Sequence, residues 1–374
     1  MARLGDVATY INGYAFKPTD WSDEGIPIIR IQDLTGNSYQ ANRFKGNYDT
    51  KYEVNCGDVL ISWSASLGVY VWTGEKAVLN QHIFKVQFDK VEVDKNFFVH
   101  QVERILNNAS GEAHGATMKH LTKPVFDSLP FYLPNIEEQK KIANELNKVS
   151  NLISLRKQQL SKLDELVKSR FIELFSDPID NPKAFPIRKL KTLSRKISDG
   201  VHAKPQYTET GRPFLSVVNI NKGVINFEGC KFVSEDAYQK MIKSTHPERG
   251  DVLYTKVGAT YGIPAYVDTD TEFCLYVSVC LIKPLHEEIN SRFLSLSMGM
   301  PYVKRQADSR IKGIGVPDLH LNQISEFDIL CPPRDLQEQF IAFVEQTDKS
   351  KFEIQKSLEK LETLKKALMQ KYFG

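Results

Sequence analysis

The chain has 374 residues, of which 41% are hydrophobic and 25% charged, and these values are typical of a folded globular protein with two or three domains. Its 49 Lys and Arg and 46 Asp and Glu leave a net charge of only +3, so any surface for nucleic acid must be local. The N-terminus has no signal-like apolar core and no apolar run is long enough to span a bilayer, which argues against membrane insertion. The five cysteines include no CxxC pair, and this favours a reduced, cytoplasmic protein.

The first part of the chain, residues 1–133, alternates short apolar runs with turns. Runs rich in β-branched and aromatic residues that follow Gly-containing turns predict strands. These runs are 26–31, 59–61, 69–72 and 83–88. Residues 97–106 have a helical pattern, and the mixture predicts an α/β or α+β domain.

A long helix is expected over residues 134–176. From residue 136 onward, apolar side chains recur every three or four positions, which is the heptad pattern of a coiled coil. Pro134 marks the start of this helix, and Asp177-Pro178 ends it.

The second part of the chain, residues 177–331, has the same character as the first. Strands are expected at 213–218, 252–254 and 277–282, with a helix over 289–298. A second heptad helix follows Pro332-Pro333 and occupies residues 332–374.

The two halves of the chain are an internal duplication. Three segments match in order between the copies: 25–34 with 211–220, 57–62 (GDVLIS) with 250–255 (GDVLYT), and 115–175 with 313–373. The rising offset requires two short insertions in the second copy. A duplicated chain of this kind predicts two similar domains related by an approximate two-fold axis.

Two matching helices of about forty residues, each roughly 60 Å long at 1.5 Å per residue, are expected to pair antiparallel and bury their apolar stripes against each other. The alternative is two separate hairpins, each packed on its own domain. The expected interface residues are Ile142, Leu146, Val149, Ile153, Leu160, Leu163, Val167, Phe340, Val344, Ile354, Leu358, Leu361 and Leu368.

The sequence carries no convincing catalytic constellation. It has no GxxxxGK[ST] phosphate loop, no GxGxxG after a strand and no Asn/Asp-Pro-Pro-aromatic motif of an adenine methyltransferase. No His or carboxylate cluster suggests a metal site, and none is expected.

Local basic clusters beside aromatic and amide residues point to nucleic acid instead. Such side chains hold phosphates and read base edges. From charge and loop position we expect DNA contacts from Lys17, Arg43, Lys45, Trp63, Lys204, Tyr207, Lys256, Lys304, Arg305, Arg310 and Lys312.

Over nearly its whole length the chain resembles the specificity subunits of Type I restriction–modification systems. The resemblance depends on the order of several segments rather than on one motif. These are 12–17 (NGYAFK) with 199–205 (DGVHAKP), the two GDVL segments, 133–139 (LPNIEEQ) with 332–337 (PPRDLQ), and 368–373 (LMQKYF).

The resemblance implies a fold and a function. Residues 1–133 and 177–331 would be target recognition domains, each reading one half of an asymmetric, bipartite site in double-stranded DNA. The long helices would form the coiled coil that sets the spacing of the half-sites and docks two methyltransferase subunits. Restriction subunits would join the complex, and S-adenosylmethionine, ATP and Mg²⁺ would be bound by the partners, so this chain would be non-catalytic and would hold no cofactor.

Two other functions stay open at this level. A coiled-coil scaffold would bind protein partners but retain no DNA, even at low salt. A nuclease would nick plasmid DNA with Mg²⁺ and no partner.

Overall fold

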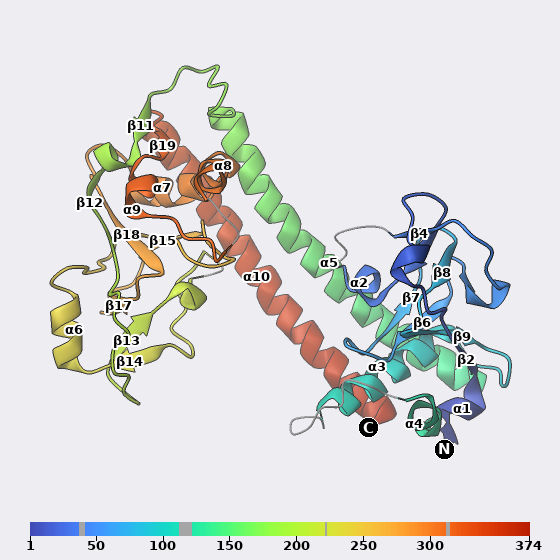
Figure 1. Ribbon diagram of the computed structural model, residues 1–374. Coiled ribbons are helices and arrows are strands. Elements are labelled where there is room, and N and C mark those ends of the chain that lie inside the picture. The colour runs from blue at the N-terminus through green and yellow to red at the C-terminus, as the bar shows by residue number, and fades with distance from the viewer. Residues whose placement is uncertain (37–41, 112–121, 221–222, 312–314) are drawn as a thin grey trace. The chain divides into compact units, whose positions relative to one another are not determined.

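The computed structural model is described for residues 1–36, 42–111, 122–220, 223–311 and 315–374. Its longest elements are two 40-residue helices, α5 (Ile136–Phe175) and α10 (Arg334–Phe373), coloured green and red in Figure 1. Packing divides the chain into two units, Met1–Gln158 with Gln355–Gly374 and Gln159–Ile354, and each unit holds about half of each long helix.

The first unit contains two four-stranded sheets and a small two-stranded one. In the first sheet all neighbours are antiparallel, and in the second β3 and β8 run parallel. The first sheet has the order β2 (Thr9–Asn12), β9 (Ile83–Gln87), β6 (Val59–Ser62), β7 (Gly68–Val71); the second β4 (Arg43–Phe44), β3 (Ile26–Ile29), β8 (Ala77–Leu79), β5 (Glu53–Val54); the third β1 (Ala2–Arg3), β10 (Pro130–Phe131). The helices are α1 (Leu4–Val7), α2 (Ile31–Leu34), α3 (Lys95–Gly111) and α4 (Lys123–Ser128), with 3₁₀ turns at Pro18–Asp20 and Thr50–Tyr52.

The second unit repeats this topology strand for strand, apart from one edge strand. Its sheets have the orders β12 (Ser194–Asp199), β18 (Val279–Pro284), β15 (Val252–Thr255), β16 (Pro264–Tyr266); β14 (Lys231–Val233), β13 (Arg212–Leu215), β17 (Cys274–Leu275); and β11 (Ile187–Lys189), β19 (Asp328–Leu330). The helices are α6 (Glu235–Met241), α7 (Ser291–Met298), α8 (Pro301–Arg310) and α9 (Leu321–Ser325), with 3₁₀ turns at Leu190–Leu193 and Val217–Asn219. The duplication in the sequence is therefore a duplication of fold.

The expected strands at 26–31 and 213–218 are confirmed but end earlier than predicted, at Ile29 and Leu215. In both copies a side chain three residues further on turns the backbone: the Arg30 N–H donates to Asp33 Oδ2 at 2.8 Å, and the Ser216 N–H to Asn219 Oδ1 at 3.0 Å. This local hydrogen bond favours a helical turn over a further strand residue.

The long helices run antiparallel in each unit. In the first unit, Tyr372 bonds to Glu145 and Lys157 pairs with Glu362, so residue numbers rise on one helix as they fall on the other. In the second unit, Lys351 pairs with Asp164 at 2.6 Å, and the Arg170 guanidinium lies 5.7 Å from the Phe343 ring centre. The fold is therefore the predicted α/β class with two long antiparallel helices forming a coiled coil.

A buried glutamine fixes the start of each long helix. Gln139 accepts from the Asp94 N–H at 2.9 Å and donates to the Pro134 carbonyl at 2.8 Å. Gln337 makes the same two bonds, with the Asn290 N–H and the Pro332 carbonyl, at the same distances. Each amide thus joins the long helix to the start of α3 or α7.

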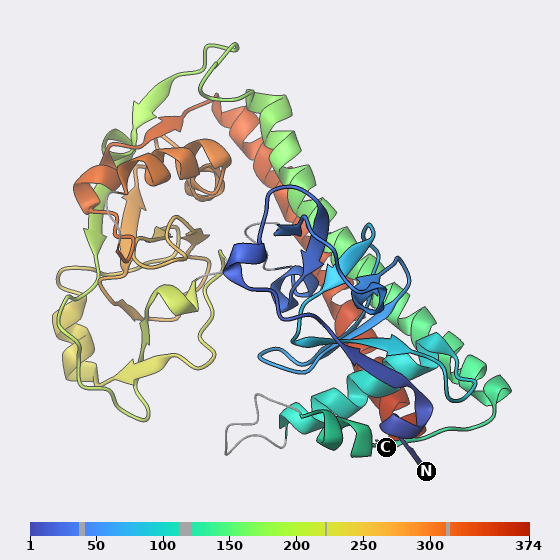
Figure 2. The ribbon, with the colours of Figure 1, turned by 45° about the vertical axis from the view of Figure 1, so that its right-hand side comes forward.

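The apolar cores pack around these helices. In the first unit, Ile142 and Leu146 of α5 join the core formed by α1, α3, α4 and the first sheet. Both chain termini lie at this unit, side by side in Figures 1 and 2. In the second unit, Phe171 and Phe175 of α5 pack with Phe293 and Phe340 of its core, so α5 contributes to a domain core at both of its ends.

Candidate nucleic-acid interface

In each unit three segments meet at one edge of the antiparallel sheet. In the first unit they are 13–17 after β2, the hairpin 63–67 between β6 and β7, and 80–82 before β9. The pairings Asn12–Phe84 and Ser62–Ile83 place these segments at the same edge. In the second unit the equivalent segments are 200–204, 256–263 and 276–278. We call this edge the strand-end site of each copy.

A glycine lets the first segment cross close to a neighbouring strand. A Cβ on Gly13 would meet the Asn80 carbonyl oxygen at 2.1 Å, and one on Gly200 the Leu275 carbonyl oxygen at 2.0 Å. The Tyr14 N–H then bonds to Leu79 O at 2.7 Å, and the Val201 N–H to Leu275 O at 2.9 Å. The backbone path through the site is thus the same in both copies.

A hydroxyl closes the hairpin in both copies. Ser62 donates its Oγ–H to the Ser66 carbonyl. Thr255 donates to the Thr260 carbonyl at 2.7 Å and accepts from the Ile263 N–H at 2.9 Å. Both hydroxyls are buried, so each holds the tip of its loop against the end of the sheet.

Trp63 and Lys256 occupy equivalent places directly after these hydroxyls. The Trp63 indole N–H donates to Asn12 Oδ1 at 3.3 Å, and its ring stacks on Phe84 with centroids 5.6 Å apart. Lys256 is 4% exposed, and its ammonium lies 3.6 Å from Asp199 and 3.4 Å from Asp318. Both residues tie the hairpin to the end of the first strand of their copy, Trp63 by a neutral hydrogen bond and Lys256 by its ion pair with Asp199.

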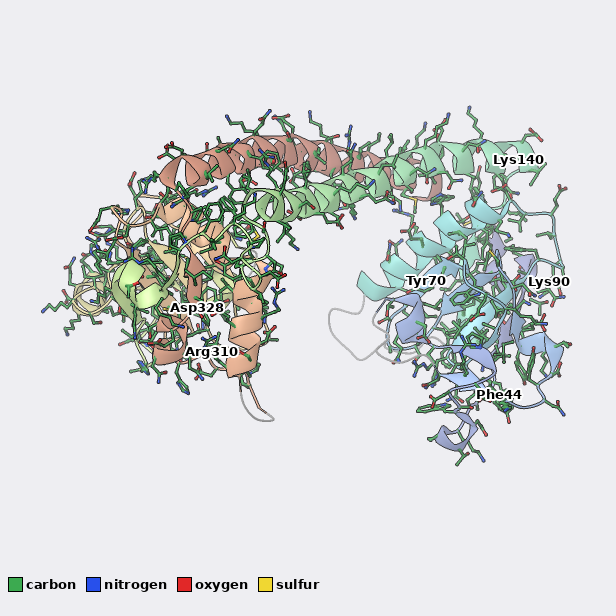
Figure 3. The ribbon with its side chains drawn as sticks, turned by 90° about the horizontal axis from the view of Figure 1, so that it is seen from above. Phe44, Tyr70, Lys90, Lys140, Arg310 and Asp328 are labelled. Atoms are coloured by element: carbon green, nitrogen blue, oxygen red, sulfur yellow. The ribbon has the colours of Figure 1, made fainter. Side chains whose placement is uncertain are left out.

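Two predicted basic residues of the first copy, Arg43 and Lys45, are engaged within the protein. Arg43 donates to the Gly25 carbonyl at 2.7 Å and pairs with Glu75 at 3.0 Å, while Lys45 pairs with Glu24 at 2.7 Å. In Figure 3 the neighbouring Phe44 lies at the far side of its unit from Lys140 of α5.

The predicted basic residues of α8 are likewise engaged within the protein. Lys304 pairs with Asp308 and lies 3.7 Å from the centre of the Tyr261 ring, and Arg305 pairs with Asp177 at 3.1 Å. Arg310, labelled in Figure 3 near Asp328, donates to two carbonyls and covers the Phe327 ring. Lys312 lies outside the described residues.

The two remaining predicted lysines differ from all of these. Lys17 and Lys204 are exposed, and within the described ranges neither ammonium has a carboxylate or carbonyl partner. Lys204 lies 5.8 Å from the centre of the half-buried Tyr207 ring, which also faces Lys231 at 4.3 Å. Each strand-end site therefore carries one exposed lysine whose ammonium is not held in an ion pair.

Residues 183–198 form a strongly basic run, with six Lys or Arg and no acidic residue, and the structure accounts for its charge. Every cation in the run has an internal partner. The pairs are Lys183 with the Glu173 and Leu174 carbonyls, Arg188 with Glu288, Lys189 with Asp328, Lys191 with Glu326, Arg195 with Glu248, and Lys196 with the Ser244 carbonyl. The residues that sequence reasoning missed are Asn12 and Asp199, whose signal was their shared place before the glycine of the repeated segment.

The expected helix-interface residues fall into two groups by burial. Buried members are Ile142, Leu146, Val149, Val167, Phe340, Val344 and Leu358. Half-buried members are Ile153, Leu160, Leu163, Ile354, Leu361 and Leu368. Five of the half-buried positions lie toward the middle of a long helix, whereas Leu368 lies near the end of α10 and packs against the core of the first unit.

Across the described part of the chain, no three His, Cys, Asp or Glu side chains come together as a metal site. Nor does any helix of the described ranges have the length and apolar character needed to cross a bilayer.

Comparison with known proteins gives a consistent family. A family model for the Type I restriction modification DNA specificity domain matches residues 1–165 and 190–366. The Type I restriction enzyme EcoBI specificity subunit of Escherichia coli is 22% identical over 403 residues, covering 99% of this chain and 84% of that protein. The MjaVIII specificity subunit of Methanocaldococcus jannaschii is 24% identical over 394 residues, covering 99% and 90%.

A solved structure has the same fold. The S subunit of a Type I restriction–modification system from M. genitalium superimposes with a TM-score of 0.55 at 16% identity, covering 100% of this chain and 95% of that one. The family model spans both copies of the duplication and most of both long helices. The chain therefore belongs to the family of Type I restriction–modification DNA specificity subunits.

Proposed function

We propose that this chain is the non-catalytic subunit that gives a Type I restriction–modification complex its DNA sequence specificity. Residues 1–133 and 177–331 act as target recognition domains, and the helical segments 134–176 and 332–374 form the spacer. Each recognition domain reads one half of an asymmetric bipartite site in double-stranded DNA. The complex works in the cytoplasm.

One observation carries the proposal: the two strand-end sites have the same backbone and different side chains. Trp63 and Asn12 in one copy stand where Lys256 and Asp199 stand in the other. A common scaffold with different readers suits two half-sites of different sequence, because base edges are distinguished by side-chain chemistry.

The remaining parts of the function belong to partners. The expected interface residues of α5 and α10 hold the coiled coil together, and the outer faces of the coiled coil dock two methyltransferase subunits. Those subunits bring S-adenosylmethionine, and restriction subunits bring ATP and Mg²⁺ chemistry. Of the predicted DNA contacts, Lys17 and Lys204 are the strongest candidates and Tyr207 lies beside the second. The cations engaged elsewhere in the protein, Arg43, Lys45, Lys304, Arg305 and Arg310, contribute less.

The test is to map methylated sites in a host with and without this chain, and then to measure binding of the assembled complex to duplexes that carry the mapped site. We expect loss of one bipartite motif without the chain, and binding that weakens steeply with salt. Tight association with partners but no DNA retention at low salt would support the scaffold instead. Nicking of plasmid by the purified chain and Mg²⁺ alone would support a nuclease.

A further inference from the structure

The repeated segments 12–18 and 199–205 contain an equivalent Lys-Pro pair. In each copy a glycine follows the first strand, the next residue makes a parallel bridge to the neighbouring strand, and lysine stands three positions later. The bridges join Tyr14 to Asn80 and Val201 to Tyr276. Tyr14 and Val201 are therefore structural equivalents, and so are Lys17 and Lys204.

Among the predicted basic residues of the described ranges, these two lysines are also the ones whose side-chain nitrogen has neither an ion-pair nor a hydrogen-bond partner. Asp20 accepts from the main-chain N–H of Lys17 at 2.8 Å but makes no ion pair with its ammonium. The Lys204 ammonium lies 5.8 Å from the centre of the Tyr207 ring and makes no ion pair with any residue that the structure describes. An exposed ammonium without a counter-charge attracts an anion more strongly than one already held in an ion pair.

The side chains around each lysine differ between the copies, although the lysine itself does not. Tyr14 and Phe16 precede Lys17, whereas Val201 and Ala203 precede Lys204. Two readers of different sequences share only the part of DNA that does not depend on sequence, and that part is the phosphate backbone.

We propose that Lys17 and Lys204 are a matched pair of phosphate anchors, one for each strand-end site, which position the two readers on DNA without contributing to sequence discrimination. This inference rests on the proposed function, because it assigns a role within DNA recognition. Discrimination then comes from the neighbouring positions at which the copies differ.

The experiment uses the full chain assembled with its methyltransferase subunits. Binding is measured across a potassium chloride series to a duplex with the mapped site and to a scrambled duplex of equal composition. Lys17→Ala and Lys204→Ala should each reduce the slope of log affinity against log salt by about 0.9, and the double variant by about 1.8. Affinity should fall by the same factor on both duplexes, leaving their ratio unchanged.

Three further variants separate charge from structure. Lys17→Arg and Lys204→Arg keep the positive charge and should keep the wild-type slope. Lys240→Ala removes an exposed lysine of α6 that is not part of the three segments of the strand-end site, and it should leave the slope unchanged. An unchanged slope in the double alanine variant, or a loss confined to the mapped site, would overturn the inference. If the wild-type complex itself shows no preference for the mapped site, the proposed function fails instead.

Discussion

At the scale of single residues, the aspartate of each Gly-Asp-Val-Leu segment forms an ion pair with a lysine of the adjacent strand. Asp58 accepts from the Asn55 N–H and pairs with Lys85 at 3.2 Å; Asp251 accepts from the Glu248 N–H and pairs with Lys283 at 2.6 Å. The motif therefore survives in both copies because it closes a turn and joins two strands.

The two pairs differ in burial, and this difference can be tested. Lys283→Met would strand the Asp251 carboxylate, which is 2% exposed, and should cost about 3–5 kcal/mol of unfolding free energy in urea. The matched variant Lys85→Met leaves a carboxylate that water still reaches and should cost clearly less. Equal losses would mean that burial does not control the contribution of the pair.

The Lys283→Met variant should also respond to pH. Burial is the main cause that raises the pKa of Asp251, and the hydrogen bond from Lys283 opposes it. Without Lys283 the folded-state pKa rises further above the unfolded value. The destabilisation caused by ionising Asp251 is then full above the folded-state pKa and disappears below the unfolded-state pKa, so the stability deficit of the variant should shrink as the pH is lowered from the first value toward the second.

The buried glutamines are a second residue-scale device. Gln337 is 2% exposed, and Gln337→Met would leave the Asn290 N–H and the Pro332 carbonyl without partners. We expect a loss of about 1–3 kcal/mol in urea unfolding. The control is Gln346→Met on the exposed face of the same helix, which should change stability by less than about 0.5 kcal/mol. If Gln337→Met leaves the free energy of unfolding unchanged, the buried amide does not contribute to stability.

At the scale of elements, sequence predicts the long helices almost to the residue. Pro134 and Pro333 mark the helix starts, and α5 and α10 begin within two residues of these prolines. The heptad pattern continues to the end of each helix. The sequence also predicts the strands that contain runs of β-branched residues. It misses short elements such as α8 and α9, because their helical pattern extends over too few residues to stand out.

The apolar interface between the two long helices gives a stability prediction at the scale of elements. Leu358 is 5% exposed on α10, and Leu358→Asp would place a charge in an apolar contact, at a cost of at least about 2 kcal/mol. Phe352→Asp, at a position 66% exposed on the same helix, should change stability by less than about 0.5 kcal/mol. Thermal and urea unfolding measure the stability of both variants. A larger loss for Phe352→Asp than for Leu358→Asp would contradict an apolar helix interface at Leu358.

Sequence locates the candidate site less well than it locates the fold. Composition reveals a cation but not the carboxylate that folding brings beside it. Arg305 meets Asp177, and Arg43 meets Glu75, across long stretches of chain. What distinguishes Lys17 and Lys204 is their equivalent place in the repeat together with the lack of such a partner within the described residues, and only the folded chain supplies the second fact.

At the scale of the whole molecule, one scaffold carries two different readers, and the proposed function makes the recognised site asymmetric. The double variant Asp199→Asn with Lys256→Trp gives the second copy the same pair as Asn12 and Trp63 in the first. It replaces ion pairs by a neutral contact at one strand-end site and leaves the other untouched.

Methylation mapping of a host that carries this double variant should therefore show a changed or relaxed preference in one half of the bipartite motif, with the other half and the spacing preserved. The change belongs to one half because base readout depends on the side chains of one copy, whereas the coiled coil and the remaining copy are the same as before. Lys240→Ala, which alters an exposed lysine of the same unit, should leave both halves as they were. If the variant complex assembles normally and still methylates the original motif, Lys256 and Asp199 do not take part in base recognition. If both halves of the motif change, the two copies do not recognise their half-sites independently.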